Sequence, residues 1–334
     1  MAEATHLTDT SEADIAFIYE PIQPQLDLVV ENLRGLAVHE NLTNGAELFA
    51  HAVLSGGKKI RPTITLLAGA LWNGSEETLV TMGTAIELLH IASLVHDDTV
   101  DKADTRRGKA TVSSIWGNNV AVLLGDYVFA SSATFVCDTG NIRVVRRFSE
   151  TIMELAQGEL AEHFSTNNWN QTVEDYNRRI YDKTASLFCT ASESGGVLSG
   201  APEDKCEALN QYGYNLGMAF QIMDDVLDFM GTEEEMGKPV GNDLVQGTLT
   251  LPVLLFGERN PDEPSVRRLQ AGGTDPADVQ EVINLVRNSP VIPQALTIMD
   301  DYRDKARAAL QRVPAHRARE SLEALVDYVG KRRA

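Results

Sequence analysis

Cysteine is scarce in this chain of 334 residues. Only Cys137, Cys189 and Cys206 are present, and their wide spacing offers neither a metal-ligand pair nor a disulfide framework. This excludes the small secreted domains that disulfides hold together. We expect a protein of a reducing compartment, and specifically a cytoplasmic one.

Basic residues are also few compared with acidic ones. The chain has 29 Lys and Arg against 48 Asp and Glu, a formal net charge of −19. Sequence-independent binding of nucleic acid or of an anionic membrane needs a basic surface, so we expect no nucleic-acid partner. The first 20 residues contain no Lys or Arg and lack the pattern of a signal peptide. No apolar run reaches the ~18 residues of a membrane span, so no transmembrane segment is predicted.

Strand signals are missing too, because no pair of alternating segments flanks a hairpin turn. Apolar residues instead recur three and four apart, as helices require, over 26–36, 79–101, 279–286 and 322–329. The sequence therefore predicts an all-α bundle with the apolar helices 79–101 and 209–230 at its centre. Asp275-Pro276 reads as a helix cap and first helical residue. We expect an acidic tail or short helix over 1–20 and a single domain over 21–334.

Three aspartates end the first of these apolar helices. Asp97 and Asp101 are four residues apart and share a helix face, with Asp98 about 100° further round. Carboxylates this close repel one another unless a cation lies among them. Hard oxygen ligands suit Mg²⁺, which is commonly completed by the phosphates of a substrate.

A second copy of the pattern, Asp224-Asp225-Val226-Leu227-Asp228, ends the other apolar helix. Two such helix ends facing each other would hold a pyrophosphate through several metal ions. A third match, 300–304, differs because Arg303, Lys305 and Arg307 lie within one turn of its aspartates. We expect that copy to be a salt-bridged outer face without a metal.

A metal-bound pyrophosphate also needs direct cationic contacts. The stretch GGKKIRP places two lysines and an arginine beside a flexible diglycine, whose amides can approach an anion closely. The first aspartates are followed by RRGK, and arginine grips phosphate oxygens with two hydrogen bonds. Three weaker signals matter only in combination with these cations: Lys183-Thr184, Gln221 and Lys238.

Seven sequence pieces, in order along 56–252, resemble the trans-isoprenyl diphosphate synthases, the polyprenyl synthetase family. They are GGKKIRP, ELLHIASLVHDDTVDKADTRRG, GDYVFA, QGE, YDKTASLF, FQIMDDVLD and GKPVGNDLVQGTLTLP. The resemblance implies the isoprenoid synthase fold, in which long antiparallel helices surround a deep cavity. It also implies a homodimer that converts isopentenyl diphosphate and an allylic diphosphate with Mg²⁺ and delivers its product to the membrane.

The resemblance also implies roles for individual residues. The metal ligands would be Asp97, Asp101 and Asp224, supported by Asp98, Asp225 and Asp228. The isopentenyl diphosphate would be held by Lys58, Arg61, His90 and Arg107. The allylic diphosphate would be held by Arg106, Lys183, Thr184, Gln221 and Lys238. The backbone carbonyl of Lys183 and the side-chain oxygens of Thr184 and Gln221 would in addition stabilise an allylic carbocation. Thr248 stands where many members carry a second lysine, which removes one expected contact to the allylic diphosphate.

Small residues predict a long product. Ala92 and Ser93 lie one turn before Asp97, where a bulky side chain would close a tunnel beneath the metal site. Small residues also prevail along 125–133, although Phe129 or Phe135 would close the tunnel earlier. Each helical turn left clear adds about 5.4 Å of depth, close to one extended isoprene unit. We therefore expect a long-chain polyprenyl diphosphate, beyond geranylgeranyl.

Other interpretations stay open. A short-chain farnesyl or geranylgeranyl diphosphate synthase would need the tunnel to be closed. A non-catalytic subunit of a heteromeric prenyl synthase would be expected to lose aspartate clusters, and both are intact. A terpene cyclase usually has a different second metal motif. A phosphohydrolase would need an aspartyl nucleophile on a strand, and no such motif is found. The basic end of the chain, 331–333, is expected to be a solvated tail.

Overall fold

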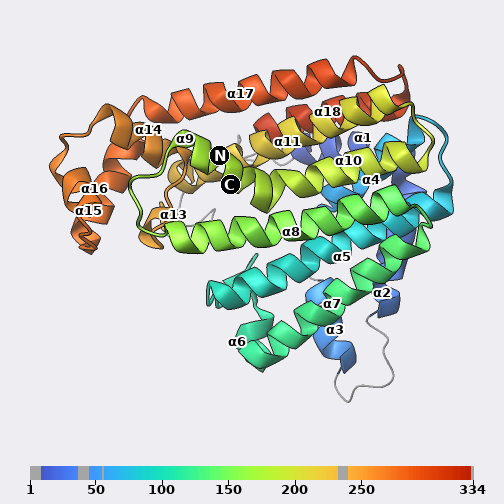
Figure 1. Cartoon of the computed structure of the whole chain (residues 1–334), viewed down its shortest axis with the longest axis horizontal. Helices are drawn as coiled ribbons and strands as arrows, with labels where there is room; N and C mark the ends of the chain where they lie inside the picture. Colours follow the sequence, from blue (N-terminus) through green and yellow to red (C-terminus); the bar gives the residue numbers. More distant parts are fainter. Residues whose placement is uncertain (1–8, 37–44, 55, 232–239, 332–334) are drawn as a thin grey trace, which may run out of the picture. The chain divides into compact units, whose positions relative to one another are not determined.

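The computed structural model describes residues 9–36, 45–54, 56–231 and 240–331, and they are almost entirely helical (Figure 1). The first elements are α1 (Asp9–Tyr19), the 3-10 turn η1 (Glu20–Ile22), α2 (Gln23–Leu36), α3 (Gly45–Val53), α4 (Ile60–Ala70) and α5 (Glu76–Val100). Next come β1 (Thr105–Arg106), β2 (Lys109–Ala110), α6 (Val112–Trp116), α7 (Asn118–Asp138) and α8 (Ile142–Ser165).

The second half of the chain continues in the same way. Its first elements are α9 (Val173–Ile180), the π-helix η2 (Tyr181–Ala185), α10 (Ser186–Leu198), α11 (Glu203–Met230) and α13 (Asn242–Val245). The last are α14 (Leu251–Arg259), α15 (Pro264–Gln270), α16 (Pro276–Arg287), α17 (Val291–Leu310) and α18 (Arg317–Lys331). The predicted all-α class is confirmed. Of the basic tail, Lys331 ends α18, and 332–333 lie outside the described residues.

The chain forms two compact units, each assembled from separate stretches of sequence. Unit 1 comprises the described residues up to Glu150 together with Leu187–Gln211 and Ala309–Leu325. Unit 2 comprises Thr151–Ser186, Tyr212–Ala308 and the described residues from Val326. The sequence predicts a single domain over 21–334, and this stays a prediction although the chain divides into two compact units.

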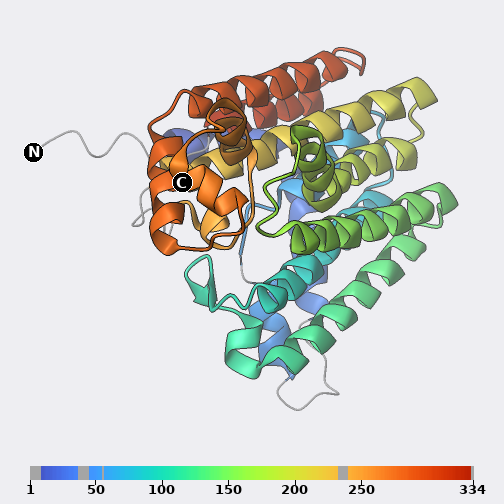
Figure 2. The same cartoon turned by 60° about the vertical axis from the view of Figure 1, so that its left-hand side comes forward.

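Helix α5 is the centre of unit 1. It packs against α2, α3, α4, α6 and α7, and its closest companion is α7, which lies beside it (Figures 1 and 2). Met82, Ile86 and Leu89 are fully buried, and apart from the buried Glu87 the acidic residues of the helix lie at its two ends. A helix that is apolar on all sides must be surrounded by protein or by lipid. The predicted central helix 79–101 is therefore confirmed, with an additional first turn.

Two helices of the described chain are long and apolar enough to cross a membrane by length and composition, in contrast to the expectation from apolar runs. They are α5, of whose most apolar window 72% is buried, and α7, of whose window 33% is buried. A mostly buried core helix passes the same test, and α5 is mostly buried. Helix α7 differs because Val122, Leu123 and Tyr127 are exposed on one face.

Unit 2 contains a group of short helices beside the longer ones. Helices α13, α14 and α15 all pack on α16 (Figure 2). The start of α16 is as predicted, because the Asp275 side chain accepts a hydrogen bond from the Ala277 amide at 2.9 Å and Pro276 is the first helical residue. The second predicted apolar helix is also confirmed, as the C-terminal part of α11.

Candidate active site

The first aspartate motif lies at the C-terminal end of α5, in unit 1. Asp101 caps the helix, and its amide donates to the Asp97 carbonyl at 2.8 Å. Asp98 is only 7% exposed, and its Oδ1 accepts a hydrogen bond from Nε of Arg106 at 2.6 Å. Burial raises the pKa of Asp98 above its usual value even though Arg106 opposes the shift. Asp98, predicted to support the metal, therefore holds an arginine in this structure.

A short hairpin follows, which the sequence analysis missed. Thr105 pairs with Ala110 and Arg106 with Lys109 in antiparallel register. The two turn residues have positive φ angles, 51° at Arg107 and 73° at Gly108. Two successive positive φ angles define a type I′ turn, which glycine tolerates and arginine rarely adopts. The signal for it was the Arg-Gly pair, and its effect is to fix both predicted phosphate-binding arginines on a tight turn.

A cluster of cations surrounds His90 on α5. Nη1 of Arg61 lies 3.2 Å from Nε2 of His90, and Nη1 of Arg107 donates to the Gly56 carbonyl at 3.4 Å. Burial lowers the pKa of His90 well below its usual value, and four positive charges lower it further, those of Arg61, Arg107, Lys59 and Arg106. The imidazole is therefore neutral, and the surrounding cations favour an anion.

The lysines of the GGKKIRP stretch have different surroundings. Lys59 was given no role from the sequence, and its Nζ lies 3.0 Å from Oε1 of Glu87. The backbone of Lys59 is left-handed, with a φ angle of 48°. The backbone carbonyl of Lys58 accepts a hydrogen bond from the hydroxyl of Tyr19, and Lys58 itself is exposed. The structure thus brings together Arg61, His90, Arg106 and Arg107 of the predicted phosphate-binding set.

The second aspartate motif lies near the C-terminal end of α11, in unit 2. Asp225 is 3% exposed, and it accepts hydrogen bonds from the Tyr176 hydroxyl at 2.6 Å and from the Gln221 amide at 2.9 Å. Burial raises the pKa of Asp225 to about 8, and the negative charges of Asp243 and Asp224 add to the shift. Asp225 is thus a carboxyl group that readily keeps its proton at neutral pH.

Asp243 is a member of this acidic cluster that sequence reasoning did not assign. Its amide donates to Oδ2 of Asp228 at 3.2 Å, and its carbonyl accepts from the amide of Thr248 at 2.8 Å. The signal was available, because Asp243 belongs to the GKPVGNDLVQGTLTLP piece. Lys238, predicted to bind the allylic diphosphate, lies outside the described residues.

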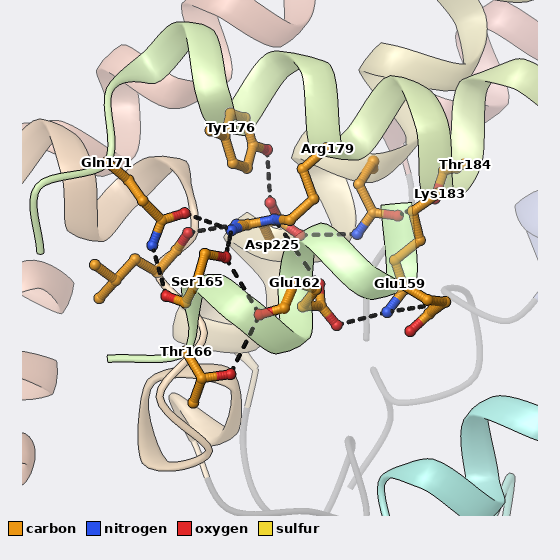
Figure 3. A network of polar contacts seen from close by, with 12 residues as sticks. Glu159, Glu162, Ser165, Thr166, Gln171, Tyr176, Arg179, Lys183, Thr184 and Asp225 are labelled. Carbon is orange, nitrogen blue, oxygen red and sulfur yellow. Dashed lines mark hydrogen bonds and ion pairs between the residues drawn. The ribbon is translucent and has the colours of Figure 1, made fainter. Parts of the chain in front are cut away.

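Lys183 and Thr184 lie in the π-helix η2, between α9 and α10. Such segments are rare and often mark functional sites. The Thr184 hydroxyl donates to Oε1 of Gln221 at 2.7 Å, which joins two residues of the predicted allylic set. Nζ of Lys183 is held by two carboxylates of α8, Glu159 at 2.8 Å and Glu162 at 2.6 Å (Figure 3).

The third aspartate motif lies on α17, and its aspartates form ion pairs with arginines, as predicted for a salt-bridged face. Arg303 binds Asp300 at 2.5 Å, and Arg307 binds Asp304 at 2.7 Å. Both arginines also approach Asp327. Its local cations therefore neutralise this motif, which separates it from the other two copies.

The residues expected to set product length lie on α5, facing into unit 1. Ala92 is fully buried, and the Ser93 hydroxyl donates to the His90 carbonyl one turn earlier at 2.9 Å. The 125–133 stretch lies on the neighbouring helix α7, where Gly125, Val128 and Ser132 are buried. The two segments thus lie on helices that pack against each other.

Metal binding requires hard donors, and both motifs supply them. Across 9–36, 45–54, 56–231 and 240–331, no three His, Cys, Asp or Glu side chains form a complete metal-binding group by themselves. In unit 2, however, Asp224 and Asp243 both act on the buried Asp225 with like charge, an arrangement that a divalent cation would relieve. Carboxylate oxygens are hard ligands that fit Mg²⁺, whose remaining ligands are commonly water and substrate phosphate.

An all-helical fold thus carries clustered carboxylates in both units and a cluster of cations around His90. The family model described as Polyprenyl synthetase matches residues 44–287. The heptaprenyl diphosphate synthase component 2 of Geobacillus stearothermophilus is 38% identical over 94% of this chain and 98% of its own length. The chain belongs to the polyprenyl synthetase family and is a trans-prenyltransferase.

Solved structures agree with this assignment. A decaprenyl diphosphate synthase from Rhodobacter capsulatus is 34% identical with a TM-score of 0.87, and the match covers 94% of this chain and 98% of that one. A polyprenyl synthase from Caulobacter crescentus, complexed with calcium and isoprenyl diphosphate, is 33% identical with a TM-score of 0.87 and covers 96% and 98%. The expected isoprenoid synthase fold is thereby confirmed.

Proposed function

We propose that this enzyme adds isopentenyl diphosphate repeatedly to an allylic diphosphate and releases a long-chain trans-polyprenyl diphosphate. The observation that carries the proposal is the neutral His90 among Arg61, Arg107, Lys59 and Arg106. A group of fixed cations around an uncharged ring suits a diphosphate rather than a carbonyl or a sugar. The relatives that make heptaprenyl and decaprenyl diphosphates support the long product.

Different residues of the chain bind the two substrates. Arg61, His90, Arg107 and Lys58 bind isopentenyl diphosphate, whereas Arg106, Lys183, Thr184, Gln221 and Lys238 bind and orient the allylic diphosphate. Mg²⁺ would be bound by Asp97 and Asp101 of unit 1 and by Asp224 of unit 2, and it would neutralise charge on the departing pyrophosphate. The backbone carbonyl of Lys183 and the side-chain oxygens of Thr184 and Gln221 would stabilise positive charge on the allylic carbon. The site must exclude water, which would quench that carbon.

The proposal is tested by product analysis. Purified protein is incubated with Mg²⁺, labelled isopentenyl diphosphate and each allylic starter in turn, and the products are separated by chain length. We expect products longer than geranylgeranyl diphosphate. Farnesyl or geranylgeranyl diphosphate as the end product would favour the short-chain alternative, and release of phosphate without condensation would overturn prenyl transfer.

A heteromeric enzyme is the second candidate, because the Geobacillus relative carries the designation component 2. Product formed by the pure chain alone would exclude a required partner. We favour a homodimer, supported by the exposed apolar face of α7 that contains Val122, Leu123 and Tyr127. Light scattering distinguishes the two assemblies. We further propose a cytoplasmic enzyme whose product passes to the membrane.

Replacing Ala92 or Ser93 by phenylalanine is expected to shorten the product. Both positions lie about one turn before the proposed metal ligand Asp97, and each turn of the tunnel that a phenyl ring closes removes about 5.4 Å of depth. Chromatography should show a shift of the main product by one or more isoprene units. The matched control is Ala308→Phe, at an exposed position of α17 outside both α5 and α7. Unchanged product length in both α5 variants would contradict the tunnel.

A further inference from the structure

The ammonium group of Lys183 forms ion pairs with two carboxylates. Its Nζ lies 2.8 Å from Oε1 of Glu159 and 2.6 Å from Oε1 of Glu162 (Figure 3). The three side chains are 27%, 31% and 25% exposed, so water reaches all of them in part. None of the roles assigned above involves either glutamate.

The backbone holds this contact in place. A Cβ atom at Gly158 would lie 2.7 Å from the Lys183 amide nitrogen, so only glycine lets α8 approach η2 this closely. Glu159 follows directly, and Glu162 lies one turn further along the same helix. Two rigid elements therefore present both carboxylates to a single ammonium group.

Arg179 fixes the second carboxylate independently of Lys183. Its Nη1 donates to Gln171 at 2.7 Å and to Ser165 at 3.3 Å, and its Nη2 donates to the Leu249 carbonyl at 2.6 Å (Figure 3). Its Nε lies 3.8 Å from Oε2 of Glu162. The guanidinium group is 4% exposed and is tied to neutral acceptors, so it stays beside Glu162 whatever Lys183 does.

A diphosphate that binds Lys183 must compete with these carboxylates. An ammonium group has three donors, and here two short contacts already draw it toward α8. A multiply charged anion brought close to Glu159 and Glu162 is also repelled by both. Glu162 keeps Arg179 as a cationic neighbour when Lys183 departs, whereas Glu159 loses its ion pair with Lys183.

We propose that Glu159 and Glu162 form a displaceable clamp on Lys183, with Arg179 as the positioning residue that retains Glu162 after the clamp opens. The clamp opposes diphosphate binding and favours pyrophosphate release, because the carboxylates compete for the same ammonium group. This inference rests on the proposed binding of a diphosphate by Lys183.

The test measures binding of inorganic pyrophosphate to the full chain by calorimetry at fixed Mg²⁺. Glu159→Gln keeps the shape of the side chain and removes one competing charge. We expect pyrophosphate to bind about three-fold more tightly, the size of a partly exposed ion pair. The KM for the allylic diphosphate should fall in parallel. A merely structural role for Glu159 would move both values in the opposite direction.

Two further variants make the result specific. Glu150→Gln removes the same charge from α8 away from Lys183, and it should leave pyrophosphate affinity unchanged. In a Lys183→Gln background, the effect of Glu159→Gln should vanish, because no ammonium group remains to be released. If Glu159→Gln weakens binding, has no effect, or still tightens it without Lys183, the clamp is overturned. A complete absence of prenyl transfer by the unaltered chain would contradict the proposed function instead, and would leave these binding differences standing.

Discussion

Replacing Asp97 or Asp224 by asparagine is expected to lower kcat/KM by about 10²–10³-fold each, the cost of removing one group that stabilises transition-state charge. The change preserves shape and removes the negative oxygen that a divalent cation requires. The measurement is the rate of incorporation of labelled isopentenyl diphosphate as a function of Mg²⁺ concentration. Part of the loss should be recovered at high Mg²⁺ if the ligand set is weakened rather than abolished.

The chain provides its own control for this experiment. Asp301→Asn alters the third aspartate motif, whose neighbours Asp300 and Asp304 are bound to arginines of the same helix. It should leave both the rate and its dependence on Mg²⁺ unchanged. An Asp97 or Asp224 variant as active as Asp301→Asn would refute the assignment of metal ligands.

Asp225 should make the stability of the metal-free protein depend on pH. Its pKa is raised to about 8, whereas an unfolded aspartate has its usual value near 4. Between these values the folded protein retains a proton that the unfolded chain has lost. The contribution of this group to the free energy of unfolding is therefore greatest below about pH 4. It is lost progressively as the pH rises to about 8.

Asp225→Asn should remove this dependence. The amide has no proton to lose, so at pH 8 the variant should be more stable than the unaltered protein by an amount on the order of a few kcal/mol. The two should converge at about pH 4. Urea unfolding in the presence of a chelator, repeated from pH 4 to pH 9, measures the difference. Parallel stability curves across that range would show that Asp225 is ionised in the folded protein.

Local chemistry made part of the site predictable. The helix that became α5 is a long, strongly apolar stretch of sequence, and its aspartates follow at the end. The contrast between the third motif and the other two was also visible, since its arginines lie three residues away on the same helix. Interactions within one helical turn depend on spacing alone, so a sequence displays them directly.

Contacts between distant segments were not predictable in this way. Tyr176 and Asp225 are 49 positions apart, and Arg179 reaches the Leu249 carbonyl across 70. Asp243 joined the acidic cluster of α11 only through the fold of unit 2. The prediction that the two aspartate motifs face each other concerns both units and stays a prediction.

The sequence by itself determined the helical class, the two aspartate motifs and the family, because periodicity, spacing and motif order are properties of the chain. Tertiary structure alone decided the protonation states and the pairing of charges. His90 is neutral and Asp225 readily protonated because burial and charges from other segments act on them. Lys183 lies between two glutamates because Gly158 lets α8 meet a π-helix. A pKa depends on the surrounding charges and solvent, and these exist only once the chain has folded.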